Sequence, residues 1–292
     1  MKKEAKKVHK AGRPEPSFES YARELIKAAL AEDVGRGDIT TRAIVGQDES
    51  GRGVFMAKED FVVAGLFMAM NVFKLLDEKA RFKTYFDDGD RIKKGHIIAE
   101  VRGGLAAILT GERVALNFLQ RMSGIATRTD MFVKKIRSTD AKILDTRKTT
   151  PCLRGLEKYA VKAGGGVNHR FGLFDSVLIK DNHIKAAGSV KEAVEKVKRA
   201  YHGKTSIEVE VTNLKEVKEA VEAGADIIML DNMDAARMKK AVSLIDHRAF
   251  VEASGGVTID NVLPIAKTGV DFISVGGLTH SARAVDISLE IE

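Results

Sequence analysis

The sequence predicts an α/β fold in which the second half of the chain forms an incomplete parallel α/β barrel. From Ile143 onward, short apolar segments alternate with amphipathic segments of helical periodicity. The helical segments 190–200 and 217–227 are nearly the same unit, and strand–helix pairs recur about every 20 residues. Six or seven strands can be identified, fewer than the eight of a closed barrel. A doubly wound open sheet is the competing architecture, but no GxGxxG motif follows a first strand.

The first half of the chain contains strands interrupted by helices. A helix is expected over 17–30, followed by a Gly- and Asp-rich loop at 32–41. Strands are expected at 54–57, 61–65, 80–86 and 97–101, and a helix at 66–76. Residues 87–101 begin with a turn and are interpreted as a structural hairpin. A long helix over 106–138 is expected to break or bend at Ser123-Gly124.

In the second half, a helix or a loop follows each expected strand. The strands are expected at 143–146, 176–180, 207–211, 226–230, 250–254 and 272–276, and the helices at 190–201, 214–223, 234–245 and 259–267. Barrel enzymes carry their chemistry where strands end and loops begin. The residues that follow each strand are therefore the candidates for a functional site.

Composition and charge limit the classes of protein to which the chain can belong. Of 292 residues 44% are apolar, enough for a sizeable core. Residues 1–16 are expected to form a disordered basic tail with six cations and two carboxylates, so the tail carries +4 of the net charge of +7. This weakens the case for a nucleic-acid binder, and no segment resembles a membrane span or a signal peptide. The single Cys152 excludes an intrachain disulfide and fits a reducing compartment, so a cytoplasmic protein is expected.

Two glycine motifs follow the last two expected strands. They are Ser254-Gly255-Gly256 and Gly276-Gly277. Exposed backbone N–H groups ahead of a helix can cradle phosphate oxygens, and late strands are where barrels commonly bind phosphate. The alternative is that these glycines merely permit tight turns. Because the motifs occur as a pair on consecutive strands, phosphate binding is favoured.

Carboxylates end two other expected strands. Glu210 and Asp231 are placed to hold Mg²⁺ or sugar hydroxyls. Glu208 shares a strand face with Glu210 because side chains alternate along a strand. One of these two glutamates could instead pair with a barrel lysine such as Lys180, and for Glu208 a role in the site is no more favoured than a structural one.

Cations gather between residues 147 and 180. The set comprises Arg147, Lys148, His169, Arg170 and Lys180. Several of these cations follow short apolar segments, where they suit a small, multiply charged anion better than a solvated surface. Cys152 lies in a Pro-Cys-Leu context without an oxyanion motif, which argues against a nucleophilic role. His and Cys spacing indicates no zinc site. A sugar phosphate together with an acidic second substrate would fit these residues.

Several motifs, taken together, resemble those of the quinolinate phosphoribosyltransferase family. They occur in family order between about residues 20 and 281 and read EDVGRGDITT, GERVALNFLQRMSGIAT, DTRKTTPCLRGLEKYAVKAGGGVNHR, LIKDNH, IEVEV, MLDN, EASGG and ISVGGLTHS. The resemblance implies an N-terminal α/β sandwich (17–124 with 282–292) and an α/β barrel phosphoribosyltransferase domain (125–281). It also implies a homodimer or higher oligomer in which the N-terminal domain of one subunit covers the barrel of another and brings Arg113 into the partner's site.

The resemblance also implies roles for individual residues. Quinolinate would be held by Arg113, Arg147, His169, Arg170 and Lys180. Phosphoribosyl pyrophosphate would be bound by Lys148, Glu210, Asp231, Ser254, Gly255, Gly256, Gly276, Gly277 and His280. Lys148, Glu210 and Asp231 would be catalytic, and the two carboxylates would hold Mg²⁺ directly or through water. No organic cofactor is expected.

The implied reaction converts quinolinate and phosphoribosyl pyrophosphate to nicotinate mononucleotide, pyrophosphate and CO₂, a step of de novo NAD biosynthesis. One alternative is a paralogue of the same fold that uses another acidic base, such as the family member associated with molybdenum transport. The pair Arg147 and Arg170 favours a diacid over a monoacid. A nucleic-acid binder lacks interleaved aromatic and basic residues. A catalytically inactive barrel is disfavoured because Lys148, Glu210 and Asp231 are all present.

Overall fold

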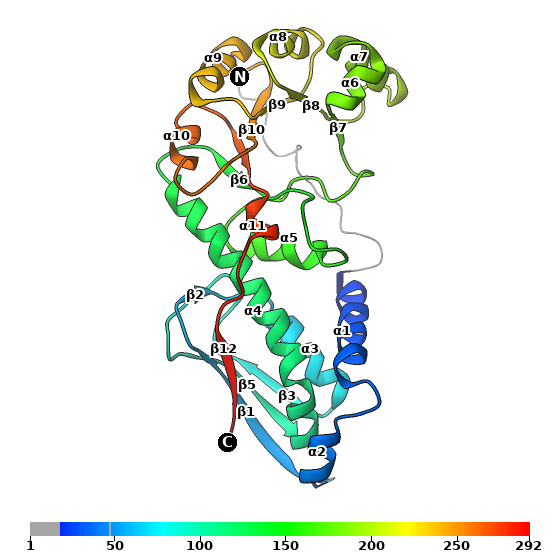
Figure 1. The fold of residues 1–292 in the computed structure, drawn as a ribbon, viewed down its shortest axis with the longest axis vertical. Helices are drawn as coiled ribbons and strands as arrows, with labels where there is room; N and C mark the ends of the chain where they lie inside the picture. The colour runs from blue at the N-terminus through cyan, green and yellow to red at the C-terminus, as the bar shows by residue number, and fades with distance from the viewer. Residues whose placement is uncertain (1–17, 47) are drawn as a thin grey trace. The chain divides into compact units, whose positions relative to one another are not determined.

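The computed structural model describes residues 18–46 and 48–292, so the expected basic tail at 1–16 lies outside the described residues (Figure 1). The described chain forms two compact units. We call residues 131–154 and 166–281 the barrel unit, and the described residues up to 130, with 155–165 and 282–292, the N-terminal unit.

The N-terminal unit is built on an antiparallel sheet. Its strand order is β12 (Ile287–Ile291), β1 (Ser50–Ala57), β5 (Ile97–Gly104), β3 (Arg81–Thr84). The helices α1 (Phe18–Val34), α2 (Ile39–Ile44) and α3 (Leu66–Leu76) belong to the same unit, and β2 (Phe61–Val62) pairs with β4 (Arg91–Ile92). Phe55 lies opposite Leu289, so the end of the chain returns to a strand near its beginning (Figure 1).

The hairpin expected over 87–101 was wrong. The short β4 pairs antiparallel with β2, whereas β5 belongs to the larger sheet. Beyond β2, backbone hydrogen bonds from Val63 to Asp90 and from Gly89 to Val63 continue the pairing with β4. The Asp88 carboxylate accepts hydrogen bonds from the N–H groups of Gly65 and Leu66 at 3.0 and 3.2 Å, where α3 begins. The expected strand at 61–65 therefore ends early, because these N–H groups serve the helix start instead of a sheet.

The long helix α4 (Leu105–Lys135) is continuous over 31 residues, so it does not break at Ser123-Gly124. Both residues instead serve packing within the N-terminal unit. The Ser123 hydroxyl accepts a hydrogen bond from the N–H of Ala64 at 3.0 Å. A Cβ atom at Gly124 would clash with the backbone carbonyl oxygen of Arg283, in the segment that leads to β12. The glycine thus permits a close approach between a helix and a backbone.

Replacing Gly124 with alanine is expected to destabilise the protein. Overpacking typically costs about 1–3 kcal/mol, and the helix propensity gained over glycine returns at most about 1 kcal/mol. The obstacle is a backbone oxygen, so a rotamer change cannot relieve it. The free energy of unfolding, measured by denaturant titration, should therefore fall.

Gly46→Ala is the matched control, since the nearest atom to its added Cβ is a Glu49 carboxylate oxygen at 3.8 Å. Equal unfolding midpoints for the Gly124 variant and the wild type would contradict the proposed close packing.

Helix α5 (Arg154–Ala163) also contributes to the N-terminal unit, through residues 155–163. Arg121 on α4 forms an ion pair with the buried Glu157 at 2.7 Å. The Tyr159 hydroxyl donates to the Asp88 carboxylate at 2.7 Å, and burial together with Asp88 raises the pKa of Tyr159 above its ordinary value. These contacts hold a segment from the middle of the chain against α4 and the start of α3.

The barrel unit contains a six-stranded parallel sheet. Its order is β6 (Lys142–Leu144), β11 (Phe272–Ser274), β10 (Phe250–Ser254), β9 (Ile227–Asp231), β8 (Ile207–Val211), β7 (Val177–Ile179). Val167 adds a parallel bridge to Leu144 on the other side of β6. The sheet lacks pairing between Val167 and β7 among the described residues. The predicted incomplete barrel is therefore confirmed.

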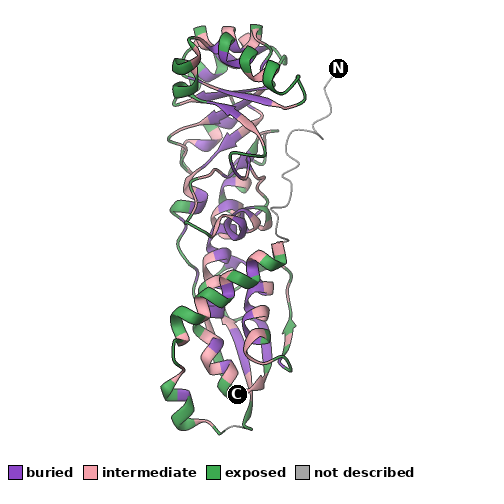
Figure 2. Cartoon of the chain, turned by 90° about the vertical axis from the view of Figure 1, so that its right-hand side faces the viewer, coloured by how far each residue is buried: buried purple, intermediate pink, exposed green. Residues whose placement is uncertain are grey.

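Helices follow the strands of the barrel unit. They are α6 (Asp181–Ala187), α7 (Val190–Ala200), α8 (Leu214–Glu222), α9 (Ala235–Ile245), α10 (Val262–Ala266) and α11 (Gly277–His280). The side chains of Ser189, Asn213 and Asp234 cap α7, α8 and α9 by accepting backbone hydrogen bonds. Val209, Ile228 and Ala253 on the central strands are fully buried, and Figure 2 shows exposed residues on the outer faces of the helices. This core gives the strand ends a rigid support.

Candidate functional site

The six parallel strands of the barrel unit bring their following residues to one edge, which we call the carboxyl edge. Most of the predicted site residues of this unit lie at the end of one of these strands or follow it closely in the sequence. Arg147 and Lys148 follow β6, Lys180 follows β7, Glu210 lies near the end of β8, Asp231 ends β9, Ser254 ends β10, and Gly276 follows β11. The sheet topology therefore collects these residues from distant parts of the chain.

Two arginines of this edge, Arg147 and Arg170, are close enough for their charges to interact. Arg170 is 8% exposed, and its guanidinium donates to the backbone oxygen of Ser176 at 3.1 Å. Burial, and then the charge of Arg147, lower the pKa of Arg170. The Nε atoms of Arg147 and Arg170 are buried without a hydrogen-bond partner among the described residues. Because an unsatisfied buried cationic donor is costly, the pair is suited to an anionic ligand.

Arg154 supports this pair, although the sequence analysis did not assign it a role. Its guanidinium donates to the Thr149 hydroxyl at 3.0 Å, to the backbone oxygen of Phe171 at 3.0 Å and to that of Arg147 at 3.4 Å. It thus joins the loop after β6 to the segment after His169. No local pattern distinguishes this arginine from its neighbours in the chain, because two of these three acceptors are backbone oxygens.

Lys148 lies beside the last glycine turn. Its backbone oxygen accepts a hydrogen bond from the Thr279 hydroxyl at 2.7 Å. A Cβ added at Gly276 would lie 3.1 Å from Cδ of Lys148 and 3.2 Å from Nε2 of His280. The structure therefore brings Lys148, Gly276 and His280 together, as a site for phosphate oxygens requires.

The other glycine turn is joined to Asp231 by Asn232. This asparagine has a positive φ of 53°, donates from its amide to Asp231 Oδ2 at 2.9 Å, and donates from its backbone to the oxygen of Ser254 at 2.9 Å. Gly255 has φ 92° and Gly256 has φ 59°, and a side chain at Gly255 would clash with the Asn232 amide. The turn therefore requires glycine in its own right.

The carboxylates divide into two groups. Glu210 and Asp231 lie near the ends of neighbouring strands and are partly exposed, and Glu210 faces Lys180 at 3.4 Å. Oxygen donors of this kind fit Mg²⁺, with water and substrate phosphates completing its coordination. Glu208 instead lies inside the barrel and faces His169 at 3.2 Å. The expected pairing of one of these two glutamates with Lys180 is thus made by Glu210, whereas Glu208 pairs with His169.

A buried cluster was not predicted. His169, Glu208 and Glu252 are the group of three among the described residues whose ligand atoms are close enough to share an ion, within 4.8 Å of one another. Burial raises the pKa of Glu208, and burial together with the charge of Glu208 raises the pKa of Glu252. Glu252 was missed because an acidic residue inside an apolar strand pattern looks like an outward-facing one until the fold is known.

Arg113 belongs to the N-terminal unit, on α4. Its side chain is exposed and forms no hydrogen bond or ion pair within the described chain.

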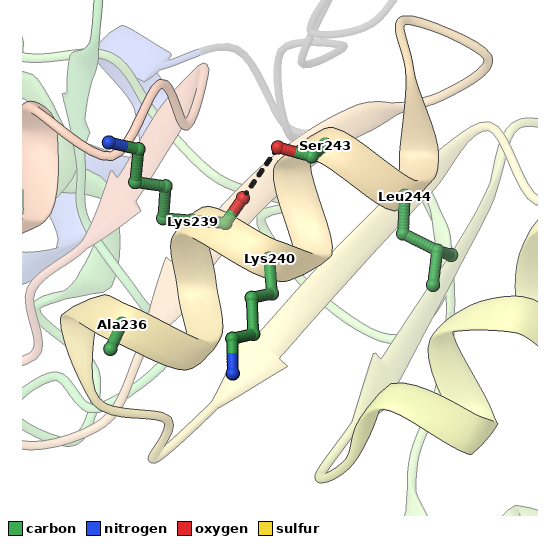
Figure 3. Close-up of a pocket in the computed structure, with 5 residues that line it drawn as sticks. All are labelled: Ala236, Lys239, Lys240, Ser243 and Leu244. Carbon is green, nitrogen blue, oxygen red and sulfur yellow. Dashed lines mark hydrogen bonds between the residues drawn. The ribbon is translucent and has the colours of Figure 1, made fainter.

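The barrel unit has surface cavities beside its helices. One of about 660 Å³ lies on α9 and is lined by Ala236, Lys239, Lys240, Ser243 and Leu244 (Figure 3). It contains none of the predicted site residues. Another, of about 460 Å³, is lined by residues of β7, α6 and α7 and reaches the carboxyl edge through Arg170. The α9 cavity therefore has no connection with the candidate site.

Comparison with known proteins gives consistent matches. The model of the quinolinate phosphoribosyl transferase C-terminal domain matches residues 125–290, and that of the N-terminal domain matches residues 38–123. The chain is 45% identical over 269 residues to the probable nicotinate-nucleotide pyrophosphorylase (carboxylating) of Bacillus subtilis, covering 92% of this chain and 93% of that protein. It is also 45% identical to the chloroplastic enzyme of that name from Arabidopsis thaliana, covering 95% and 85%.

Solved structures match over the same extent. The nicotinate-nucleotide pyrophosphorylase of Francisella tularensis has a TM-score of 0.88 and 40% identity, covering 94% of this chain and 96% of that one. The corresponding protein of Ehrlichia chaffeensis has a TM-score of 0.89 and 40% identity, covering 96% and 100%. In addition, no helix in the described part of the chain is both long and apolar enough to cross a membrane.

Proposed function

The chain belongs to the quinolinate phosphoribosyltransferase family, and we propose that the carboxyl edge of its barrel unit is where the family's reaction takes place. The reaction transfers the phosphoribosyl group of phosphoribosyl pyrophosphate to quinolinate, with loss of CO₂, and yields nicotinate mononucleotide and pyrophosphate. The observation that carries the location is the pair Arg147 and Arg170, whose buried Nε atoms have no partner in the described chain. The relatives support this reaction and not the alternative paralogue with another acidic base.

We assign the cations to the two quinolinate carboxylates. Arg147, His169, Arg170 and Lys180 form the quinolinate pocket of the barrel unit, and Arg113 of a second subunit completes it. Arginine pairs with carboxylates through two parallel hydrogen bonds, so two arginines suit a diacid. Burial, and then repulsion from Arg147, lower the pKa of Arg170, and a bound dianion would relieve this repulsion.

We assign the remaining residues of the carboxyl edge to the binding of phosphoribosyl pyrophosphate. Ser254, Gly255, Gly256, Gly276, Gly277 and His280 bind its 5′-phosphate, where backbone N–H groups are open to anions. Lys148 reaches toward the pyrophosphate, and Glu210 and Asp231 hold the ribose hydroxyls. Mg²⁺, bound with this substrate and held by Glu210 and Asp231 directly or through water, would supply positive charge for the leaving pyrophosphate. No organic cofactor is needed for this chemistry.

The residues act by charge and orientation. Lys148 stabilises the leaving pyrophosphate. The ribose becomes oxocarbenium-like, and the charges of Glu210 and Asp231 offset its positive charge. The clamped carboxylates hold the quinolinate nitrogen against the anomeric carbon, so that a bimolecular attack becomes effectively unimolecular. When the adjacent carboxylate leaves as CO₂, the positive charge of the new pyridinium nitrogen stabilises the electron pair that remains on the ring carbon, and this carbon then takes up a proton from water.

We further propose a homodimer or a larger homo-oligomer with the site shared between subunits, and a cytoplasmic location. The shared site is supported by Arg113, which is exposed and has no partner within the described chain. The location is supported by the single cysteine, which allows no intrachain disulfide. The two-domain division (17–124 with 282–292, and 125–281) is kept as the functional division of the chain.

The proposed site makes a direct prediction for substrate choice. Incubated with Mg²⁺ and phosphoribosyl pyrophosphate, the protein should release CO₂ and form mononucleotide from quinolinate but not from nicotinate, since a monoacid leaves one arginine unpaired. Arg147→Ala should raise KM for quinolinate by roughly 10²-fold, the scale of a lost buried charge pair, with a smaller change in KM for phosphoribosyl pyrophosphate.

Lys239→Ala is the matched control, because it removes a cation from α9 outside the site (Figure 3). Equal turnover of nicotinate, or an unchanged KM for quinolinate in Arg147→Ala, would contradict the assignment of the diacid to this edge.

A further inference from the structure

Two glutamates inside the barrel have no role in the reaction as described. Glu208 on β8 is 2% exposed and Glu252 on β10 is fully buried. Both lie beside His169, whose Nε2 is 3.2 Å from Oε2 of Glu208 and 3.7 Å from Oε1 of Glu252. Two carboxylates buried this closely cannot both keep a negative charge at ordinary cost. One of the two carboxyl groups must therefore be neutral or be paired with a group that offsets its charge.

The hydrogen bonds show where a proton is needed. The Ser274 hydroxyl donates to Oε1 of Glu252 at 2.5 Å. The other oxygen, Oε2, is buried and finds no donor or acceptor among the described side chains as long as Glu252 is taken as a carboxylate. One carboxyl oxygen of Glu208 and one of Glu252 lie within 4.8 Å of each other. A hydrogen bond between two carboxyl groups requires a proton, and that proton would satisfy the orphaned oxygen.

The surroundings place this proton on Glu252. Oε1 and Oε2 of Glu208 lie 3.4 and 3.2 Å from Nε2 of His169, so both can accept from the ring hydrogen. Glu252 is fully buried, its Oε1 accepts from the Ser274 hydroxyl, and its Oε2 has no partner among the described residues. Burial raises the pKa of Glu252, in agreement with this geometry. The carboxylate therefore belongs to Glu208, beside the ring of His169, and the neutral acid belongs to Glu252.

The neighbouring hydrogen bonds also indicate which ring nitrogen of His169 carries the hydrogen. Its Nδ1 accepts a hydrogen bond from the backbone N–H of Arg170 at 2.8 Å, so the ring hydrogen belongs on Nε2, toward Glu208. The backbone N–H of His169 donates to Asp145 at 2.9 Å. The imidazole is thus held between Glu208 on one side and the backbone of Arg170 on the other.

We propose that Glu252 is a neutral carboxylic acid that donates its proton to Glu208, and that this buried carboxyl pair is a positioning unit for His169 and Arg170. The proposal rests on the quinolinate pocket proposed above. A single negative charge behind His169 and Arg170 leaves the pocket attractive to a dianion, whereas two would oppose the substrate. Neither glutamate touches the reacting atoms, because both act through His169.

The test compares two substitutions at Glu252. Gln keeps a neutral donor of the same shape, whereas Met fills a similar volume without donating. E252M is expected to raise KM for quinolinate about 10-fold, within the range for disturbed supporting residues, with kcat and KM for phosphoribosyl pyrophosphate changed much less. E252Q is expected to restore most of the loss. If Glu252 had a purely structural role, E252M and E252Q would change KM for quinolinate equally, or only kcat and stability would fall.

A spectroscopic measurement follows the imidazole directly. The ¹⁵N signals of His169, identified by their loss in H169Q, should report the Nε2-protonated neutral ring in the wild type and in E252Q. In E252M, they should report a mixture of ring forms. Because this arm needs no turnover, it distinguishes failure of the inference from failure of the proposed function, which would show as no quinolinate turnover by the wild type.

E100M is the matched control, since Glu100 is a buried glutamate of the N-terminal unit that is paired with Arg52. It should leave KM for quinolinate and the His169 signals unchanged. The inference is overturned if E252M keeps the wild-type KM, if E252Q is as defective as E252M, or if elemental analysis of the purified protein finds a stoichiometric ion that is lost in E252M.

Discussion

Lys148→Ala should lower kcat by about 10³-fold, the upper range for removing one group that stabilises developing charge in a desolvated site. The leaving pyrophosphate gains negative charge in the transition state, and Lys148 is the cation proposed to face it. The loss should therefore fall mainly on kcat, while KM for quinolinate changes little. Single-turnover measurements with saturating substrates separate this chemical step from binding.

The structure gives this prediction its geometric basis. The Thr279 hydroxyl holds the backbone oxygen of Lys148 at 2.7 Å, and Gly276 lets the lysine stem pass beside His280. Lys148→Arg keeps the charge but not the compact ammonium, so it should recover part of the activity. Lys239→Ala on α9 serves as the control for loss of a cation elsewhere. A Lys148→Ala enzyme with near-normal kcat would exclude the lysine from the proposed catalytic role.

The repeating half of the fold was readable from the sequence, because short, largely apolar segments alternate with segments of helical periodicity. β8 and β10 have the predicted bounds, 207–211 and 250–254. Helix α3 also has its predicted bounds, 66–76, since its apolar residues recur at helical spacing. The positions that carry candidate chemistry followed from the strand ends, because parallel strands present their carboxyl ends at one edge.

Features that depend on distant partners were not readable. β4 is two residues long, and its pairing with β2 is decided by Val63 and Asp88 rather than by its own pattern. The glycine at 124 looked like a helix break, although its reason lies in Arg283, 159 positions along the chain. Glu252 and Arg154 were likewise missed, since their partners come from other strands and loops. Local patterns record burial and turn chemistry, but they carry no information about which remote atom fills a given space.

Arg113→Ala should lower kcat/KM for quinolinate by roughly 10²- to 10³-fold, the scale of a lost charge pair in a desolvated interface. The reason is that Arg113 is proposed to pair with a quinolinate carboxylate in the site of the neighbouring subunit. Its exposed side chain has no partner in the described part of its own chain, so its removal should cost little stability. Thermal unfolding near the wild-type midpoint would show that the activity loss is not a folding defect.

Mixing two inactive variants tests the shared site itself. In a dimer of one Arg113→Ala subunit and one Lys148→Ala subunit, one site has an intact lysine and receives the intact arginine from its neighbour, whereas the other site lacks both. Random co-assembly of equal amounts should therefore recover about a quarter of wild-type activity, since half of the dimers are mixed and each has one intact site. Co-expression of differently tagged subunits, followed by purification through both tags, isolates the mixed dimers. These should have about half of the activity of a wild-type dimer, because one of their two sites is intact. If each site were built from one subunit alone, both sites of every mixed dimer would remain defective, and no activity would return.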